Sequence, residues 1–157
     1  MNLTPEFQGA ALVALAMFLG GVVGIEREIK SKPAGLRTHM LVCGSAALLV
    51  IVGNFLIEHY AQTLKWNMVS SDPTRVIQAI IVGVSFIGAG TILHPDKVER
   101  VKNLTTAGSI LFTTGIGLSV ALEKFALAIV VTFLLLAVNS IVGFIEKKTF
   151  EKKQKNA

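Results

Sequence analysis

The chain alternates five long apolar stretches with short polar connectors. Each stretch holds 17 to 21 residues and contains no Asp, Glu, Lys or Arg. A helix needs about 20 apolar residues to cross the hydrocarbon core of a bilayer. The pattern therefore predicts an all-α integral membrane protein with five transmembrane helices, over residues 7–25, 40–57, 76–93, 106–122 and 125–145.

Two of the predicted helices begin with similar sequences. Thr4-Pro5 precedes the first helix and Asp72-Pro73 precedes the third, 68 residues later. Thr or Asp can cap a helix, and Pro fits its first turn. Two hypotheses stay open: a parallel duplication of helix pairs 1–2 and 3–4, or two hairpins of similar length that match by chance. Four further identities occur at the same offset, namely Phe18 with Phe86, Gly20 with Gly88, Leu36 with Leu104, and Thr38 with Thr106.

The composition excludes a soluble enzyme. Hydrophobic residues make up 52% of the chain and charged residues 16%, whereas a soluble domain has about 45–50% and about 25%. The longest connector has about 18 residues, which is too short for a catalytic domain. No nucleophile with a neighbouring base and no zinc-ligand spacing is evident. We therefore expect no catalytic residues and no cofactor, and magnesium stays open as a ligand with no residues assigned to it.

The basic residues fall on alternate connectors. The first connector, the third connector and the C-terminal tail hold 12 of the 15 Lys and Arg residues. The positive-inside rule places these segments in the cytoplasm, so the N-terminus is expected outside and the C-terminus inside. Residues 1–148 then form a membrane domain and residues 149–157 a basic cytoplasmic tail. Because the charges mark sidedness, we expect the lipid bilayer as a partner and no nucleic acid.

Polar residues gather at the predicted cytoplasmic ends of the first, second and fourth helices. Glu26 and Lys30 are four residues apart, so one interpretation is a solvated ion pair on one helix face. The alternative is that Glu26 meets Arg37 across the hairpin, with Ala34-Gly35 forming the turn. The candidate functional cluster on this side comprises Glu26, Arg27, Arg37, Thr38, Thr105 and Thr106.

Asp72 and Arg75 form a candidate site on the predicted outer side. They are three residues apart, so they can pair on one helix face. The structural alternative is that Asp72 caps the third helix while Arg75 extends to the membrane surface. A charge pair at a membrane edge is also a candidate functional site.

Small and hydroxyl-bearing residues mark the predicted helix contacts. Helices in lipid associate by close packing, which small residues permit. Thr106, Ser109 and Thr113 share one face of the fourth helix, where they either bond to neighbouring helices or line a hydrated path. Helix contacts are expected at Gly20, Gly24, Gly83, Gly88 and Gly90.

Three blocks of sequence together resemble the MgtC/SapB family of bacterial membrane proteins. They are Gly20–Thr38 with its continuation to residue 46, Asp72–Arg75 through Gly83 to Gly88-Ala89-Gly90, and Leu104–Ala107 with Gly117. The chain departs from the family pattern at three positions. Longer members carry a soluble cytoplasmic C-terminal domain, so the resemblance implies a short form that lacks it. The departures are Asn103 where many members have Gly, Gly108 where they have a second Ala, and Leu111 where a Trp is common.

The resemblance implies a multi-span protein of the bacterial cytoplasmic membrane, linked to magnesium homeostasis and acclimation to low magnesium. It favours a non-enzymatic regulator that acts on a membrane partner such as the ATP synthase. The alternative is an oligomeric channel or carrier for magnesium, another cation or a small solute, with Thr106, Ser109 and Thr113 along the path. Both hypotheses imply another membrane protein or self-association as a partner.

Overall fold

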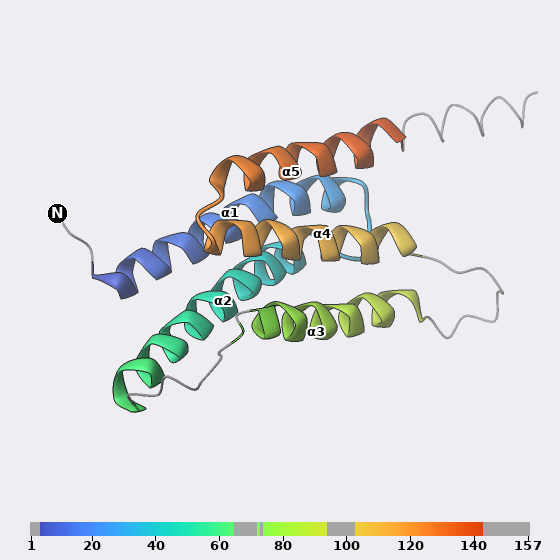
Figure 1. The fold of residues 1–157 in the computed structure, drawn as a ribbon. Helices are drawn as coiled ribbons and strands as arrows, with labels where there is room; N and C mark the ends of the chain where they lie inside the picture. Colours follow the sequence, from blue (N-terminus) through green and yellow to red (C-terminus); the bar gives the residue numbers. More distant parts are fainter. Residues whose placement is uncertain (1–3, 65–71, 73, 94–102, 143–157) are drawn as a thin grey trace, which may run out of the picture.

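Helices account for the regular structure in the computed structural model, which describes residues 4–64, 72, 74–93 and 103–142. No strand occurs in these residues, which confirms the all-α prediction. The helices run side by side as a bundle (Figure 1). They are α1 (Pro5–Ile29), α2 (Leu36–Leu64), α3 (Thr74–Ile92), α4 (Leu104–Ala121) and α5 (Phe125–Ala137), with a π-helix over Val138–Val142 directly after α5.

Four of these helices are long and apolar enough to cross a membrane. They are α1, the Leu36–Tyr60 part of α2, α3 and α4, and Phe125–Ile141 forms a shorter apolar helix. Each helix lies along one of the five apolar stretches of the sequence, and residues 143–145 of the fifth stretch lie outside the described residues. A fifth membrane span stays a prediction. The orientation in the membrane and the duplication stay predictions. The tail at 149–157 and most of the basic third connector lie outside the described residues.

The α4 helix lies at the centre of the bundle. It contacts each of the other four α-helices in the described structure. In Figure 1 it runs between α1 and α5 on one side and α2 and α3 on the other. Half of the α4 span is buried by these neighbours, whereas side chains such as Leu111 and Phe112 remain exposed.

Glycines allow α1, α2 and α4 to approach one another closely. A Cβ atom built on Gly20 would lie 2.6 Å from the Cβ of Cys43, and one on Gly24 would lie 2.6 Å from the Cα of Leu36. Real Cβ atoms essentially never come that close. The predicted helix contacts are therefore confirmed at Gly20 and Gly24. Gly117 of α4 belongs to the same set, because its Cβ would collide with the backbone of Cys43 from the other side.

The glycines of α3 lie in a looser environment. A Cβ on Gly88 would lie 3.6 Å from the Cβ of Ala107, which is an ordinary contact with α4. Nothing lies within 4 Å of a Cβ built on Gly83 or Gly90. The contact predicted at Gly88 is thus present, whereas the described part of the chain offers no contact to Gly83 or Gly90.

The turn between α1 and α2 depends on Glu28, which the sequence interpretation did not single out. Its Oε2 accepts a hydrogen bond from the backbone N–H of Leu36 at 2.8 Å, so it caps the first turn of α2. A Cβ on Gly35 would lie 2.8 Å from this oxygen, so glycine makes the approach possible. The predicted turn at Ala34-Gly35 leads directly into α2, and the left-handed residue of the connection is Ser31, with φ 51°.

The connector between the fourth and fifth apolar stretches has only two residues, Glu123 and Lys124, which requires a tight antiparallel turn between α4 and α5, and the structure has one. Glu123 has φ 58°, and the backbone N–H of Lys124 donates to the carbonyl of Ser119 at 2.8 Å. The Glu123 side chain accepts a hydrogen bond from Gln8 at 3.2 Å, which ties the start of α1 to this turn. Pro5 opens α1 as predicted, but the predicted side-chain cap by Thr4 is absent.

Candidate functional site

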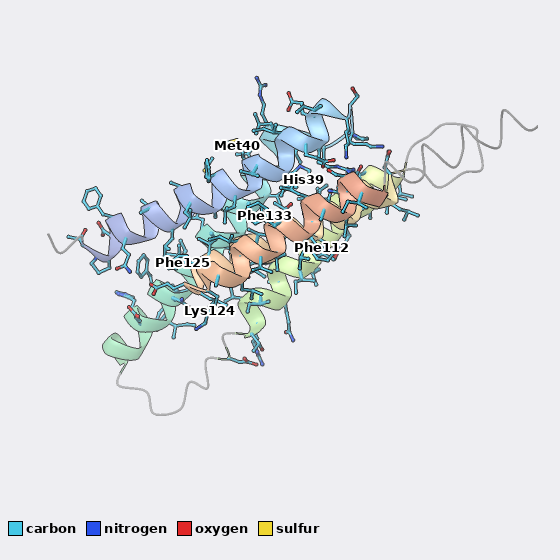
Figure 2. All side chains as sticks on the ribbon, turned by 90° about the horizontal axis from the view of Figure 1, so that it is seen from above. His39, Met40, Phe112, Lys124, Phe125 and Phe133 are labelled. Atoms are coloured by element: carbon cyan, nitrogen blue, oxygen red, sulfur yellow. The ribbon has the colours of Figure 1, made fainter. Side chains whose placement is uncertain are left out.

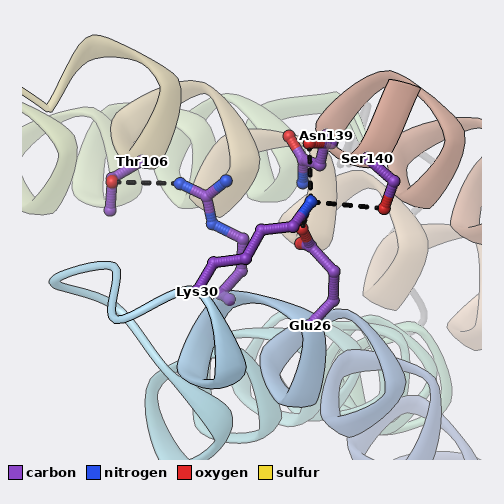
Figure 3. A network of polar contacts seen from close by, with 6 residues as sticks. Glu26, Lys30, Thr106, Asn139 and Ser140 are labelled. Carbon is purple, nitrogen blue, oxygen red and sulfur yellow. Dashed lines mark hydrogen bonds and ion pairs between the residues drawn. The ribbon is translucent and has the colours of Figure 1, made fainter. Parts of the chain in front are cut away.

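Polar side chains gather at the end of the bundle where α1 ends, α2 and α4 begin, and the π-helix follows α5. Figure 3 shows the part of this set that surrounds Lys30. In Figure 2, His39 lies toward the end of the bundle opposite the α4–α5 turn, which Lys124 and Phe125 mark. We call the set the polar cluster: Glu26, Arg27, Lys30, His39, Thr106, Ser109, Asn139 and Ser140.

Arg27 is the most deeply buried charged residue of the polar cluster. Its side chain is 2% exposed, and its Nη2 donates a hydrogen bond to Thr106 Oγ1 at 3.2 Å. Its Nε has no hydrogen-bond partner among the described residues. Burying a charge is costly unless it is paired. This guanidinium therefore holds α1 against α4 while part of its hydrogen-bonding capacity remains unmet.

Lys30 joins α1 to the π-helix. Its Nζ lies 2.5 Å from Glu26 Oε1, so the predicted i,i+4 ion pair is confirmed. The same Nζ donates to the carbonyl oxygen of Asn139 at 2.9 Å and to Ser140 Oγ at 3.3 Å (Figure 3). The Glu26–Lys30 contact is an ion pair by distance, and neither Glu26 carboxylate oxygen accepts an aligned hydrogen bond in the described structure.

His39 is fully buried between α2 and α4. Its Nδ1 lies 3.0 Å from the carbonyl oxygen of Gly35, which only accepts, so Nδ1 carries a proton. Its Nε2 lies 3.3 Å from Ser109 Oγ, and that hydroxyl also lies 2.9 Å from the carbonyl of Thr106. The hydroxyl has one hydrogen for two acceptors, so the imidazole and the α4 backbone share it when His39 is neutral.

The charges of the polar cluster favour an anionic group over a divalent cation. The cluster holds two cations, Arg27 and Lys30, and one carboxylate, Glu26, which pairs with Lys30. Mg²⁺ binds through carboxylates together with water molecules or phosphates. No three His, Cys, Asp or Glu side chains come together in residues 4–64, 72, 74–93 and 103–142. The magnesium hypothesis therefore draws no set of ligands from the cluster and stays a prediction.

The hydroxyl face of α4 points into the bundle. Thr106, Ser109 and Thr113 share this face, as the sequence predicts, and each is at most 2% exposed. The Ser109 hydroxyl is within hydrogen-bonding distance of the Thr106 carbonyl, and Thr113 donates to the Ser109 carbonyl at 2.8 Å. Thr106 Oγ1 accepts from Arg27. The hydroxyls of α4 are thus used in hydrogen bonds to carbonyl groups of α4 and to the Arg27 guanidinium of α1.

Three residues assigned to the cytoplasmic cluster lie away from its centre. Arg37 and Thr105 are exposed, and Thr38 is half-buried. The predicted approach of Glu26 to Arg37 is wrong, because Glu26 pairs with Lys30 on its own helix. Of the six predicted residues, the polar cluster brings together Glu26, Arg27 and Thr106.

Asp72 acts as the cap of α3. Its Oδ1 accepts from the Thr74 backbone N–H at 2.9 Å and from Thr74 Oγ1 at 2.7 Å. These bonds, with a smaller contribution from the charge of Arg75, hold the pKa of the Asp72 carboxyl below its usual range. Asp72 and Arg75 form no ion pair, so the predicted charge pair is corrected to a cap and a separate exposed cation.

Comparison with known proteins identifies the family. A sequence model described as the MgtC family matches residues 13–148. The chain belongs to the MgtC family. It is 38% identical over 127 residues to YhiD of Escherichia coli K12, which is named as a candidate magnesium transporter, and the match covers 79% of this chain and 57% of YhiD.

Two further relatives carry the family names. SapB of Bacillus subtilis is 37% identical over 107 residues, which cover 68% of this chain and 44% of SapB. MgtC of Brucella abortus is 33% identical over 137 residues, which cover 87% of this chain and 52% of that protein. The chain thus spans about half the length of the curated relatives it matches. No solved structure matches it.

The structure explains two departures of this MgtC-family chain from the pattern of its family. Asn103 has φ 66°, a left-handed conformation that Gly adopts freely and that Asn tolerates better than most residues. Its side chain donates to the carbonyl of Thr91 at 3.1 Å, so it also joins the end of α3 to the start of α4. Gly108 has open space around it, so the site fits either Gly or Ala.

Sequence reasoning missed several members of the polar cluster as site residues. The sequence predicts Lys30 only as part of an ion pair with Glu26. His39 and Ser140 carried no assignment. His39 lies four residues after Gly35, which is one helical turn. Its bond to the Gly35 carbonyl was therefore detectable from the sequence in principle. The contacts of Lys30 with Asn139 and Ser140 join residues more than 100 positions apart, so nothing in the local sequence predicts them.

Proposed function

We propose that the chain is a non-enzymatic regulator in the bacterial cytoplasmic membrane, where it acts on a membrane-protein partner during acclimation to low magnesium. The link to magnesium rests on the MgtC family and on the name of the relative YhiD. The membrane location rests on four helices of membrane-spanning length and composition.

The burial of the hydroxyl face of α4 carries this proposal. A path for ions needs hydroxyl or carbonyl oxygens that replace water around the ion. Here Thr106, Ser109 and Thr113 are enclosed by neighbouring helices, and their hydroxyls are engaged in hydrogen bonds within the bundle. The residues assigned to a path thus serve helix packing, which supports the regulator over the channel or carrier.

The outward face of α3 is the surface proposed for the partner. This helix buries only Ile80 and Gly88. Phe86 is 76% exposed, and Gln78 is exposed with no hydrogen-bond partner among the described residues. Amides in membrane helices bond to neighbouring helices when one is available. A partner helix along Gln78 and Phe86 satisfies this requirement.

The experiment is co-reconstitution with the ATP synthase in sealed proteoliposomes, with a photo-reactive residue in place of Phe86. We expect slower ATP-driven proton pumping and one cross-linked adduct between position 86 and a synthase subunit. The matched control carries the same group in place of Phe133 of α5, which is 65% exposed. Unchanged pumping, or equal adducts at the two positions, would remove the support for regulation of this partner through α3.

A flux measurement tests the alternative function. The purified protein in sealed vesicles with a magnesium-sensitive dye inside is expected to give no saturable uptake of magnesium. Saturable uptake that is lost on replacement of Thr113 by Val, from protein shown to be folded, would instead establish the channel or carrier.

A further inference from the structure

A cleft of about 740 Å³ lies between α2 and α3. Leu41 and Leu49 line it on α2, and Ala79, Gly83 and Ile87 line it on α3. Arg75 also lines the cleft and is the only charged residue that does so among the described residues. The cleft is therefore largely apolar, runs along two helices of membrane-spanning length, and has one cationic side chain, Arg75, in its lining.

The cleft exists because α2 and α3 touch closely near one end and then diverge. A Cβ on Gly53 would lie 3.2 Å from Val76, at the start of α3. Two turns further along α3, Gly83 has nothing within 4 Å. A void between helices forfeits dispersion contacts on both walls. In a bilayer, the acyl chains of lipids can fill such a void.

Arg75 is available to a ligand. Its side chain is exposed, and its guanidinium makes no hydrogen bond or ion pair with the described residues. Asp72 forms no ion pair with Arg75, and its Oδ1 instead accepts two hydrogen bonds from Thr74. Arg75 lies in the first turn of α3, at the membrane–water interface expected from the sequence. Guanidinium groups bind phosphate through paired hydrogen bonds.

We propose that this cleft binds one membrane phospholipid, with an acyl chain between α2 and α3 and the phosphate on Arg75. The lining matches the two parts of a phospholipid, because one cation lies at the interface and apolar groups continue below it. Basic groups between transmembrane helices are a known way of holding lipid head groups. The site is separate from the proposed partner surface, since Gln78 and Phe86 do not line the cleft.

The test measures lipid retention by native mass spectrometry after the protein is stripped in detergent and titrated with phosphatidylglycerol. Gly83→Leu fills the cleft, and it has space for the added side chain at its Cβ. Gly90→Leu is the matched control, because Gly90 lies on the same helix with equally open space but does not line the cleft. We expect one lipid on the wild type and on Gly90→Leu, and about tenfold weaker binding to Gly83→Leu.

A second pair of variants keeps the proposal testable if Gly83→Leu does not fold. Arg75→Gln removes the charge–phosphate bonds and should weaken binding about tenfold. Arg37→Gln removes another exposed arginine and should leave binding unchanged. Equal retention by Arg75→Gln and the wild type would overturn the proposal. Equal losses of lipid binding in Gly83→Leu and Gly90→Leu would also overturn it. A protein dimer that Gly83→Leu abolishes would overturn it too, because the occupant of the cleft would then be a second copy of the chain.

Discussion

The α4 and α3 helices are neighbours of similar length, yet they are packed in different ways. Half of the α4 span is buried inside the bundle, compared with 11% of the α3 span. A glycine of α4, Gly117, meets the backbone of α2, whereas Gly83 of α3 faces open space. The comparison teaches that a glycine in a membrane helix marks either a close contact or a vacancy. We therefore expect substitutions on α4 to change mainly the stability of the protein, and substitutions on α3 to change mainly the binding of lipid or partner.

The largest expected effect tests the packed side. Gly117→Ala should lower the free energy of unfolding by about 3 kcal/mol, because the new Cβ would collide with the backbone of Cys43. Gly108→Ala on the same helix has open space and should change it by less than about 1 kcal/mol. Denaturation in mixed micelles, followed by circular dichroism, measures both. Equal effects of the two substitutions would show that α4 is not more tightly packed at Gly117.

The buried arginine should show the next largest effect. Arg27→Met leaves the Thr106 hydroxyl without its donor inside the bundle, which should cost about 1–3 kcal/mol. Arg37→Met removes an exposed arginine and should change stability by about 0.5 kcal/mol or less. The melting temperatures of the two variants in the same detergent give the comparison. A stable Arg27→Met protein would mean that α1 and α4 do not depend on this contact.

Loss of the Lys30 contacts should have a smaller, local effect. Lys30→Met removes the bonds to the Asn139 carbonyl and Ser140, each worth about 1 kcal/mol. Hydrogen exchange of the backbone in Val138–Val142 should therefore become up to about thirtyfold faster. Lys32→Met serves as the control, because Lys32 is exposed. If exchange rises equally in both variants, the π-helix is not held by Lys30.

The smallest effect concerns the start of α3. Because the pKa of Asp72 is lowered in the folded state, its carboxylate stabilises the helix start above the ordinary Asp value of about 4. This contribution is lost as the pH falls through the lowered pKa. The amide resonance of Thr74, followed by NMR against pH, should titrate below the ordinary value in the wild type and stay flat in Asp72→Asn. A titration at or above the ordinary value would contradict the cap.

The sequence allowed the helices to be predicted because its apolar stretches have the length that a bilayer demands. The tight α4–α5 turn and the ion pair between Glu26 and Lys30 also followed, since both depend on residues close in the chain. The glycine contacts were predicted less well. Spacing along one helix does not reveal whether a neighbour reaches a given face, so Gly20 and Gly83 look alike in sequence.

The polar cluster was predicted only in part, for a related reason. Arg27 and Thr106 were singled out, but their direct contact joins residues 79 positions apart. Lys30 and Asn139 are 109 positions apart, and they meet because α5 packs against α1 and leads into the π-helix that carries Asn139. Glu28 was missed because its role as the cap of α2 depends on the path of the turn. Such contacts require the three-dimensional arrangement of the helices.

The unequal lengths of α2 and α3 connect the protein to the thickness of its membrane. With 29 residues, α2 is about 43 Å long, and with 19 residues α3 is about 28 Å long. The hydrocarbon core is about 30 Å thick, so α3 fits it while α2 must tilt or extend beyond it. The apolar part of α2, residues 40–57, is about 27 Å long, so α2 extends past the hydrocarbon at its polar end, from Glu58 onward. The two helices therefore match one bilayer thickness, and the extra length of α2 lies in the head-group region and the water.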